Sequence, residues 1–591
     1  MSLATLKRLL GFLRPYRRSV IWSLVFAWAA MAMTVLIPFL VGRTVNVIQD
    51  KNHHAVLPLV LAVLGAAVLR LGLTFVRRLT AGKVSVNVEY DLRSNFYGHL
   101  QRLELGFFDS QQTGQLMSRA TVDLQGIRFF LGYGLIFLTQ NALTLLLAGA
   151  VMFAIQPGLA ALALAPVPLV VFTASRYNRR SRPAVQEIQQ RLAELTAEVE
   201  ESISGIRIVK AFAREPYMLA RFRRTVNRVF DQNVYSTRLS AFYSPLLGFL
   251  PSLGLAAILL VGGRRVINHQ MTLGDFAAFY TYLMMLIGPM RILGTSLGMA
   301  QRAVAAGNRM FEILDREPRI DDAPGAQPLP DGRGTVEFRD VSLTYTGESA
   351  ALEDVELRIE AGRTVALVGP SGSGKTSLVA LLARLYDPTH GRVVIDGADV
   401  RDVKLTSLRS EVAFVAEESF LFSASVAENI SYARPEATQE EIELAARRAQ
   451  AHEFIERLPN GYETVIGQRG LTLSGGQRQR IAIARALLAD PRVLVLDDAT
   501  SSVDARTEAA IRDGFAEVME GRTTFIVAHR LSTISLADEI VVLDEGRVVD
   551  RGTHDELVAR SPLYQEIAGY GCDDSVYLQR DLEEREEVAR L

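Results

Sequence analysis

Long apolar runs confined to the first half of the chain constrain its fold more than any other feature. A helix needs about 20 consecutive apolar residues to cross a bilayer. Such runs occupy 19–42, 55–77, 129–155, 158–176, 241–263 and 272–296. Over the whole chain, 49% of the residues are hydrophobic and 22% are charged. These averages combine the apolar first half with an ordinary globular sequence at 335–570. We therefore expect a six-span, α-helical transmembrane domain over 1–316, with both termini on one side of the membrane.

The stretches between some of these runs, 78–128 and 177–240, are too polar for lipid but keep a helical period. Ile188, Leu192 and Leu195 recur at spacings of three or four residues. We expect spans two to five to continue as helices well into the cytosol. The many arginines of these stretches agree with that placement, but the loops at 43–54 and 264–271 are also basic.

Polar residues and prolines interrupt the spans at several positions. Gln140 and Asn141, near the middle of span three, fit a substrate cavity or a helix–helix hydrogen bond equally well. Arg70 and Arg291 lie near the cytosolic ends of their predicted spans. For both, we favour a guanidinium group that snorkels to the membrane surface over one that lines a cavity. The prolines tolerated inside spans are Pro38, Pro166, Pro168, Pro245, Pro251 and Pro289.

The remaining segments outside the spans are short. Leu3–Leu13 predicts an amphipathic helix on the membrane surface, and we expect no cleavable signal. A polar linker at 317–334 separates the two halves, and a charged, helical tail is expected at 571–591. The single cysteine, Cys572, allows no intrachain disulfide, and the net charge of −1 gives no reason to expect a nucleic-acid partner.

The second half contains a phosphate-binding motif. GPSGSGKTS at 369–377 fits G-x-x-x-x-G-K-[ST] between an apolar strand at 364–368 and a helical run at 378–386. Its glycines let backbone amides face phosphates at a helix N-terminus, and Lys375 adds a charge. Thr376 supplies a hydroxyl to Mg²⁺, so ATP and Mg²⁺ are the expected cofactors. The candidate contacts are Gly369, Ser371, Gly372, Ser373, Gly374, Lys375, Thr376 and Ser377.

Two further motifs follow this loop. VLVLDDAT at 493–500 predicts a buried strand that delivers Asp497 to the metal. LSGGQRQR at 473–480 places two glycines after a serine at a helix start, which makes a second anion-binding end. It lies about 20 residues before Asp497, so it cannot easily serve the phosphates that the 369–377 loop holds.

In this order the motifs resemble the ATPase domain of ABC transporters. Segments of the first half, GFFDSQQTGQLMSR at 106–119, SGIRIVKAF at 204–212 and QRAVAAGNRMFEILD at 301–315, resemble the six-span exporter class (type IV, multidrug-type). The implied fold is a six-span domain with long cytosolic helices, fused to an α/β P-loop ABC ATPase domain. The implied location is the cell inner membrane, with both termini and the ATPase domain cytoplasmic.

The resemblance also implies roles for individual residues. Tyr345 stacks on adenine, and His529 is the switch histidine. Each ATP lies between one chain's P-loop and the other chain's LSGGQ, so the residues that serve the partner's ATP are Ser474, Gly475, Gly476, Gln477 and Asp504. Two cytosolic coupling helices are implied, within about 107–123 and near 212–218, the second docking on the partner's ATPase domain.

Two residues depart from the family pattern in the chain's own ATP site. Asp498 stands where the family has a general-base glutamate, and it is shorter by about 1.5 Å. A misplacement of about 1 Å can lower a rate about a hundredfold. Glu417 stands where the family has a glutamine that contacts Mg²⁺ and water. We therefore predict an impaired hydrolytic site, against the alternative of sequence drift with retained activity.

Since its LSGGQ is intact, the chain resembles most closely the degenerate-site half of bacterial heterodimeric multidrug exporters, which are similar to the antigen-peptide transporter. The expected partner is a second half with a competent Asp-Glu pair. The expected substrates are amphipathic drugs, lipids or peptides. One alternative is a homodimer with two slow sites. Another is an ATP-gated channel or regulatory membrane protein, which the lack of a long insertion between the halves disfavours.

Overall fold

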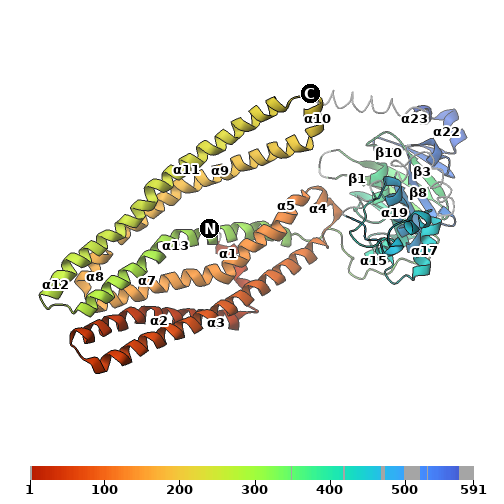
Figure 1. Ribbon diagram of the computed structural model, residues 1–591. Coiled ribbons are helices and arrows are strands. Elements are labelled where there is room, and N and C mark those ends of the chain that lie inside the picture. Colours follow the sequence, from red (N-terminus) through yellow and green to blue (C-terminus); the bar gives the residue numbers. More distant parts are fainter. Residues whose placement is uncertain are drawn as a thin grey trace. The chain divides into compact units, whose positions relative to one another are not determined.

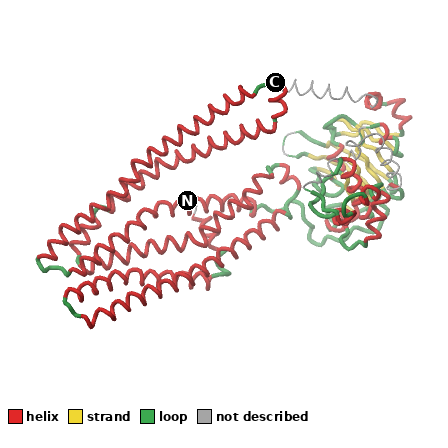
Figure 2. The backbone as a smooth tube through the Cα atoms, viewed as in Figure 1, coloured by secondary structure: helices red, strands yellow, loops and turns green. Residues whose placement is uncertain are grey.

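The computed structural model describes residues 3–345, 347, 349–416, 419–467, 473–497, 519–528 and 530–570, apart from the side chains of 290–297, 532 and 570. The chain divides into two compact units. The helical unit comprises Met1–Gln101 and Thr113–Arg316, and the sheet unit comprises Arg102–Gln112 and Glu317–Leu591. Figure 2 shows that the described strands all belong to the sheet unit.

Six long helices make up most of the helical unit (Figure 1). They are α2 (Arg17–Gln49), α3 (His53–Leu100), α7 (Leu135–Ile155), α9 (Val167–Ser204), α11 (Glu215–Ala257) and α13 (Leu273–Leu314). The shorter helices are α1 (Leu3–Gly11), α5 (Thr113–Ser118), α6 (Leu124–Phe129), α8 (Pro157–Leu164), α10 (Ile206–Ala211) and α12 (Gly263–Ile267). Three π-helical turns, η1 (Arg119–Asp123), η2 (Phe130–Gly134) and η3 (Ile258–Gly262), join some of them.

Five helical stretches of the described residues are long and apolar enough to cross a membrane. They are Arg17–Gln49, His53–Leu100, Thr113–Ile155, Pro157–Ser204 and Glu215–Ile267. They contain the first five predicted spans. The sixth, 272–296, falls within α13, and some of its side chains lie outside the described residues, so it stays a prediction.

The predicted continuation of the spans into polar helices is confirmed. α3, α9 and α11 run without interruption from apolar into polar sequence, and Figure 1 shows α9 and α11 side by side. The span predicted at 158–176 is instead two helices, since α8 ends at Leu164 and α9 begins at Val167. Pro166 lies at this break, where it has no amide hydrogen to continue the helix.

The predicted N-terminal helix is confirmed as α1, but its apolar side packs on protein. Leu9 is fully buried and lies against Gly307 of α13. The Arg8 guanidinium donates two hydrogen bonds to Asp315, at 2.7 and 2.6 Å. These contacts attach α1 to α13 rather than leaving its apolar face on the membrane surface.

The sheet unit contains two sheets. An antiparallel sheet has the order β2 (Leu352–Ile359), β1 (Val336–Leu343), β4 (His390–Ile395), β5 (Ala398–Asp399). The second has the order β10 (Arg547–Gly552), β9 (Glu539–Asp544), β3 (Thr364–Val368), β8 (Thr523–Val527), β7 (Val493–Asp497), β6 (Val412–Val415). Its neighbouring strands are parallel except for the β10–β9 pair. The α/β fold predicted for this half is thus present.

Helices flank these sheets. They are α4 (Leu105–Asp109), α14 (Lys375–Ala380), α15 (Leu405–Glu411), α16 (Val426–Ile430), α17 (Gln439–Arg448), α18 (His452–Glu456), α19 (Gly475–Ala489), α21 (Leu531–Ile534), α22 (His554–Arg560) and α23 (Pro562–Tyr570), with 3₁₀ turns η4 (Ser431–Ala433) and η5 (Gly461–Glu463). Every residue of β3, β7 and β8 is buried, as expected of parallel strands covered on both faces. Because these strands are parallel, their carboxyl ends meet at one edge, where ligands of such sheets bind.

Candidate functional site

The loop between β3 and α14 has the backbone that the phosphate-binding motif requires. Gly372 and Gly374 have φ angles of 81° and 97°, which favour glycine. A Cβ atom at Gly369 would lie 2.1 Å from the carbonyl oxygen of Leu543, and one at Gly374 would lie 2.6 Å from that of Ala351. Side chains larger than glycine therefore do not fit, and the backbone is free to curl around an anion.

Lys375 is 5% exposed and is held inside this loop. Its Nζ donates to the carbonyl oxygens of Gly369 and Pro370, at 2.7 and 2.8 Å. These bonds satisfy a buried ammonium group. They also fix it beside the loop amides, so that phosphate oxygens entering the loop meet a positive charge already in position.

Thr376 and Asp497, the two described residues predicted to serve Mg²⁺, lie together. The Thr376 hydroxyl donates to the Asp497 carboxylate at 3.3 Å. Two oxygens that bind one Mg²⁺ in octahedral geometry at about 2.1 Å are about 3 Å apart, so the pair fits this ion. Among the described residues no group of three His, Cys, Asp or Glu side chains could hold a metal. A Mg²⁺ shared with phosphates needs only one or two protein ligands.

Tyr345 lies beside the phosphate loop with part of its ring accessible. Its hydroxyl donates to the Ser377 hydroxyl at 2.9 Å, and the side chain is 45% exposed. Burial of the remainder raises the pKa of Tyr345. Part of the side chain is thus accessible, as the predicted adenine contact requires.

The LSGGQ segment forms the N-terminus of α19. The Ser474 hydroxyl accepts from the Gln477 amide at 3.3 Å, and the Ser474 amide donates to the Gln477 side chain at 2.9 Å. This reciprocal capping box fixes the start of the helix. Gly475 and Gly476 occupy the first helical positions, so their backbone amides point outward from a helix end that attracts anions.

Four predicted site residues, Glu417, Asp498, Asp504 and His529, lie outside the described residues. The strands that precede three of them are described. β6 ends at Val415, β7 at Asp497 and β8 at Val527, and these are neighbouring parallel strands.

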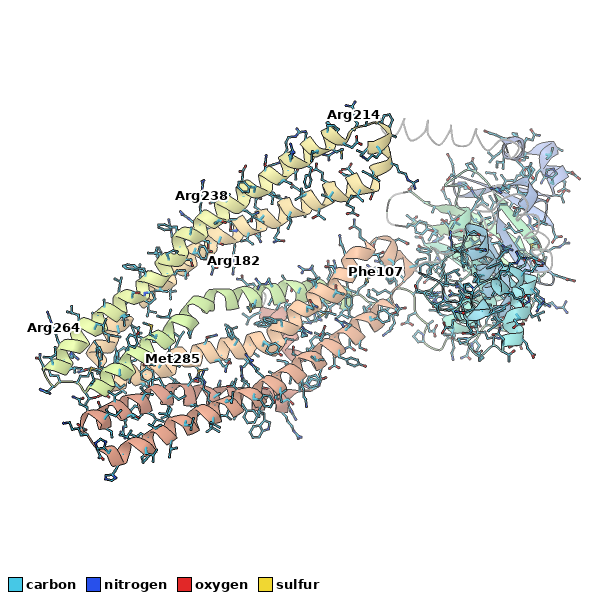
Figure 3. All side chains as sticks on the ribbon, viewed as in Figure 1. Phe107, Arg182, Arg214, Arg238, Arg264 and Met285 are labelled. Carbon is cyan, nitrogen blue, oxygen red and sulfur yellow. The ribbon has the colours of Figure 1, made fainter. Side chains whose placement is uncertain are left out.

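The sheet unit also holds α4, which sequence reasoning did not connect with the nucleotide residues. Phe107, labelled in Figure 3, is 3% exposed. The Tyr386 hydroxyl donates to the Asp109 carboxylate, and the Tyr386 ring meets the Tyr345 ring edge-on with centroids 4.9 Å apart. Burial, and then the bond to Asp109, raise the pKa of Tyr386. A helix from between the membrane segments therefore contacts the proposed adenine platform through one tyrosine.

Of the two implied coupling helices, the first agrees with the expectation in position, since α5 falls inside 107–123 and α4 overlaps its start. The second differs. α10 ends at Ala211, before the second expected segment, where α11 begins at Glu215. No signal near Tyr386 indicated its contact with α4, since the two are far apart in sequence.

The helical unit contains a cavity of about 490 Å³. Its lining includes Arg77, Arg78, Phe129, Tyr133, Phe137 and Gln140. The Arg77 guanidinium donates to the Gln140 side chain at 2.8 Å. Gln140 therefore makes the predicted bond between helices and also lines a cavity, whereas Asn141 bonds to the Phe137 carbonyl of its own helix.

Comparison with known proteins places this geometry in context. Residues 20–290 match the ABC transporter transmembrane region, and residues 352–501 match the ABC transporter family. The ABC transporter ATP-binding protein YknU of Bacillus subtilis (strain 168) is 39% identical over 95% of this chain and 97% of that protein. The multidrug efflux ATP-binding/permease protein Rv0194 of Mycobacterium tuberculosis is 38% identical over 97% of this chain, which spans 48% of that protein.

A solved structure gives the same picture for the fold. The structure of a bacterial Atm1-family ABC exporter with ATP bound superimposes with a TM-score of 0.77 and 30% sequence identity, over 93% of this chain and 97% of that chain. With a membrane region, an ATPase domain and near full-length similarity to YknU, this chain belongs to the ABC transporter family.

Proposed function

We propose that this chain is one half of an ATP-driven exporter in the cell inner membrane. It moves amphipathic drugs, lipids or peptides outward from the cytosolic side. The observation that supports this most is the phosphate loop with Lys375 buried in it and Thr376 3.3 Å from Asp497, in the same chain as apolar membrane helices. The multidrug efflux name of Rv0194 and the exporter with ATP bound point to the same class.

In this proposal each half contributes to both ATP sites. The chain's loop at 369–377 binds the phosphates of one ATP, with Tyr345 beside its base. The capped end of α19 at Ser474 faces the ATP on the partner's loop. ATP binds the closed arrangement of the two ATPase domains more tightly than the open one, and this difference shifts the membrane helices toward an outward-open cavity. Hydrolysis at the competent site resets them.

The two sites are proposed to be unequal. Asp498 keeps the charge of a glutamate but not its reach, and Glu417 adds negative charge where a neutral amide is usual. Phosphoryl transfer depends mainly on positioning, so the chain's own site holds ATP but hydrolyses it slowly. Since the LSGGQ segment is intact, the partner's site is supported. The proposed partner is a different half with an Asp-Glu pair.

The composition of the complex tests the heterodimer. The tagged chain is purified from its source cells in lipid nanodiscs and analysed by native mass spectrometry. The proposal predicts one copy of 65.1 kDa with a second, different half, which carries an Asp-Glu pair. Two identical copies with rapid ATP turnover would contradict it and establish the homodimer.

Transport tests the exporter itself. Inside-out vesicles with the assembled complex should accumulate labelled amphipaths only with ATP, and Lys375→Ala should abolish that uptake. Ion currents that ATP opens in planar bilayers, without accumulation of any amphipath, would contradict an exporter and indicate a channel.

A further inference from the structure

The cavity lined by Arg77, here named the Arg77 cavity, has a composition that selects among amphipathic ligands. Its volume of about 490 Å³ lies in the range of small-molecule sites, roughly 300–1,000 Å³. Arg77 and Arg78 come from α3, at the point where the apolar run 55–77 ends. Residues of α6, η2, α7 and α13 complete the lining.

The charge of this cavity is positive. None of its described lining residues is Asp or Glu. The helices that form it contain no acidic residue at 55–88, 124–186 or 276–311. A guanidinium that is partly removed from water is costly to maintain without an anionic partner.

The nearest acidic residues in sequence are already paired. Glu89 accepts from Arg128 at 2.6 Å and from Arg93 at 2.7 Å. The Arg309 guanidinium bonds to both carboxylate oxygens of Asp123, at 2.8 and 2.5 Å. Neither carboxylate is therefore available to neutralise Arg77 or Arg78.

Arg77 itself retains unused donor capacity. One terminal nitrogen donates to Gln140 at 2.8 Å, which is a neutral partner. Its Nε is buried and has no hydrogen-bond partner among the described residues. An arginine that only snorkels to water would expose all of its donors, so the burial of Nε shows that Arg77 packs into the protein rather than serving as a simple membrane anchor.

Three aromatic side chains line the same cavity as these charges. Phe129, Tyr133 and Phe137 line the cavity and are 48%, 43% and 37% exposed. Phe129 and Tyr133 pack with ring centroids 6.0 Å apart. Their exposed faces offer apolar surface within the same cavity as the two guanidinium groups.

We propose that the Arg77 cavity binds the acidic head of an amphipathic substrate, and that this exporter therefore transports anionic amphipaths. A carboxylate or phosphate is bound by Arg77 and Arg78, with Gln140 orienting Arg77, and the apolar body lies on Phe129, Tyr133 and Phe137. This inference rests on the proposed export function and adds the substrate class.

The test uses the assembled transporter in vesicles with four probes that share one dansyl-dodecyl body. Their heads are a carboxylate, a phosphate, a trimethylammonium and a hydroxyl group. We expect ATP-driven uptake to favour the two anionic probes. In an Arg77→Gln/Arg78→Gln variant their apparent affinity should fall roughly tenfold to hundredfold, as for loss of hydrogen bonds to a charged group.

Two control variants separate charge recognition from folding. Arg77→Lys/Arg78→Lys keeps the charge and should restore much of the anionic uptake. Arg70→Gln removes an arginine of the same helix that does not line the cavity, and it should behave as wild type. Equal losses in the Arg70 and Arg77/Arg78 variants would overturn the proposal.

The remaining outcomes are also decisive. Preferred uptake of the cationic or neutral probe by the wild type would overturn the substrate class and leave the exporter intact. A phospholipid could also co-purify with the wild type and be lost from the Arg77→Gln/Arg78→Gln variant while uptake of the anionic probes stays unchanged. That result would show that the cavity holds a structural lipid, and it would overturn the proposal. No ATP-driven uptake of any probe or other amphipath would instead refute the proposed export function.

Discussion

At the scale of single residues, the spacing of two oxygens makes a metal prediction. Thr376 and Asp497 hold their oxygens 3.3 Å apart, close to the separation of two ligands on one Mg²⁺. Asp497→Asn removes the charge but keeps the shape. ATP should bind wild type roughly tenfold more tightly with Mg²⁺ than with EDTA, and this difference should vanish in the variant. Equilibrium binding of a fluorescent ATP analogue measures it; a retained Mg²⁺ effect would exclude Asp497 as a ligand.

Tyr345 gives a second prediction at this scale. Stacking of a base on an aromatic ring contributes about 1–3 kcal/mol, so Tyr345→Ala should weaken ATP binding about tenfold or more. Tyr345→Phe loses only the bond to Ser377 and should stay within about twofold. Competition binding with ATP and with inorganic triphosphate distinguishes the two effects. Equal weakening by both substitutions would show that the hydroxyl, not the ring, determines affinity.

At the scale of elements, Tyr386 joins α4 to the nucleotide residues. Tyr386→Phe removes the hydrogen bond to Asp109 and keeps the edge contact with Tyr345. We expect unchanged ATP affinity and a several-fold fall in substrate transported per ATP, because a hydrogen bond to a charged group contributes about 1.5–3 kcal/mol. Vesicle uptake and ATP turnover, measured together, give this ratio.

Tyr462→Phe is the matched control for that variant. It removes one tyrosine hydroxyl of the same unit, which lies 2.9 Å from His452 Nδ1, and it does not contact α4. Transport per ATP should stay normal in this control. If the Tyr386→Phe variant transported as much substrate per ATP as the wild type, the proposed role of the Tyr386–Asp109 bond would be contradicted. Equal losses of transport per ATP in the Tyr386→Phe and Tyr462→Phe variants would contradict it as well.

The N-terminus of α19 gives a prediction about the partner's site. Ser474→Ala removes the capping hydroxyl, which destabilises a helix by about 1 kcal/mol, and also removes a group that is proposed to face the partner's ATP. ATP hydrolysis by the assembled transporter should fall at least tenfold, while ATP binding to the chain's own loop is retained. Thr553→Ala breaks a similar capping box on α22. If it lowers hydrolysis as much, the effect of Ser474 is only structural.

Local sequence patterns predicted the elements that depend on local physics. The helical period of 177–240 predicted α9 and α11, since residues three and four apart share a face. The motif at 369–377 predicted the strand, loop and helix around Lys375. The break at Pro166 was missed because prolines in membrane helices are often tolerated.

Contacts between residues far apart in the chain could not be predicted from local sequence patterns. α4 belongs to the sheet unit, where Asp109 accepts a hydrogen bond from Tyr386, a residue 277 positions away in the sequence. Likewise, no sequence pattern marked Arg77 as part of a cavity. Its place in a cavity depends on how α3 packs against α7 and α13, which no local pattern encodes.

At the scale of the whole molecule, the central claim is an inequality between two ATP sites. The chain keeps the LSGGQ segment that is proposed to support its partner, and it departs from the family pattern at Asp498 and Glu417, which are proposed to belong to its own site. The claim concerns the assembled transporter, because each site is proposed to need residues of both halves. A direct test must therefore separate the two sites within one assembly.

That separation is possible with residues of this chain alone. In a Ser474→Ala background hydrolysis at the proposed partner's site is expected to be low, and Lys375→Ala, which is expected to remove hydrolysis by the chain's own loop, serves as the blank. Single-turnover phosphate release is measured with Asp498 and with Asp498→Glu. With Asp498 we predict a rate of phosphate release close to that of the Lys375→Ala blank. With Asp498→Glu we predict a rate about a hundredfold higher. Rapid release with Asp498 already present, or no increase with glutamate, would contradict the proposed impairment.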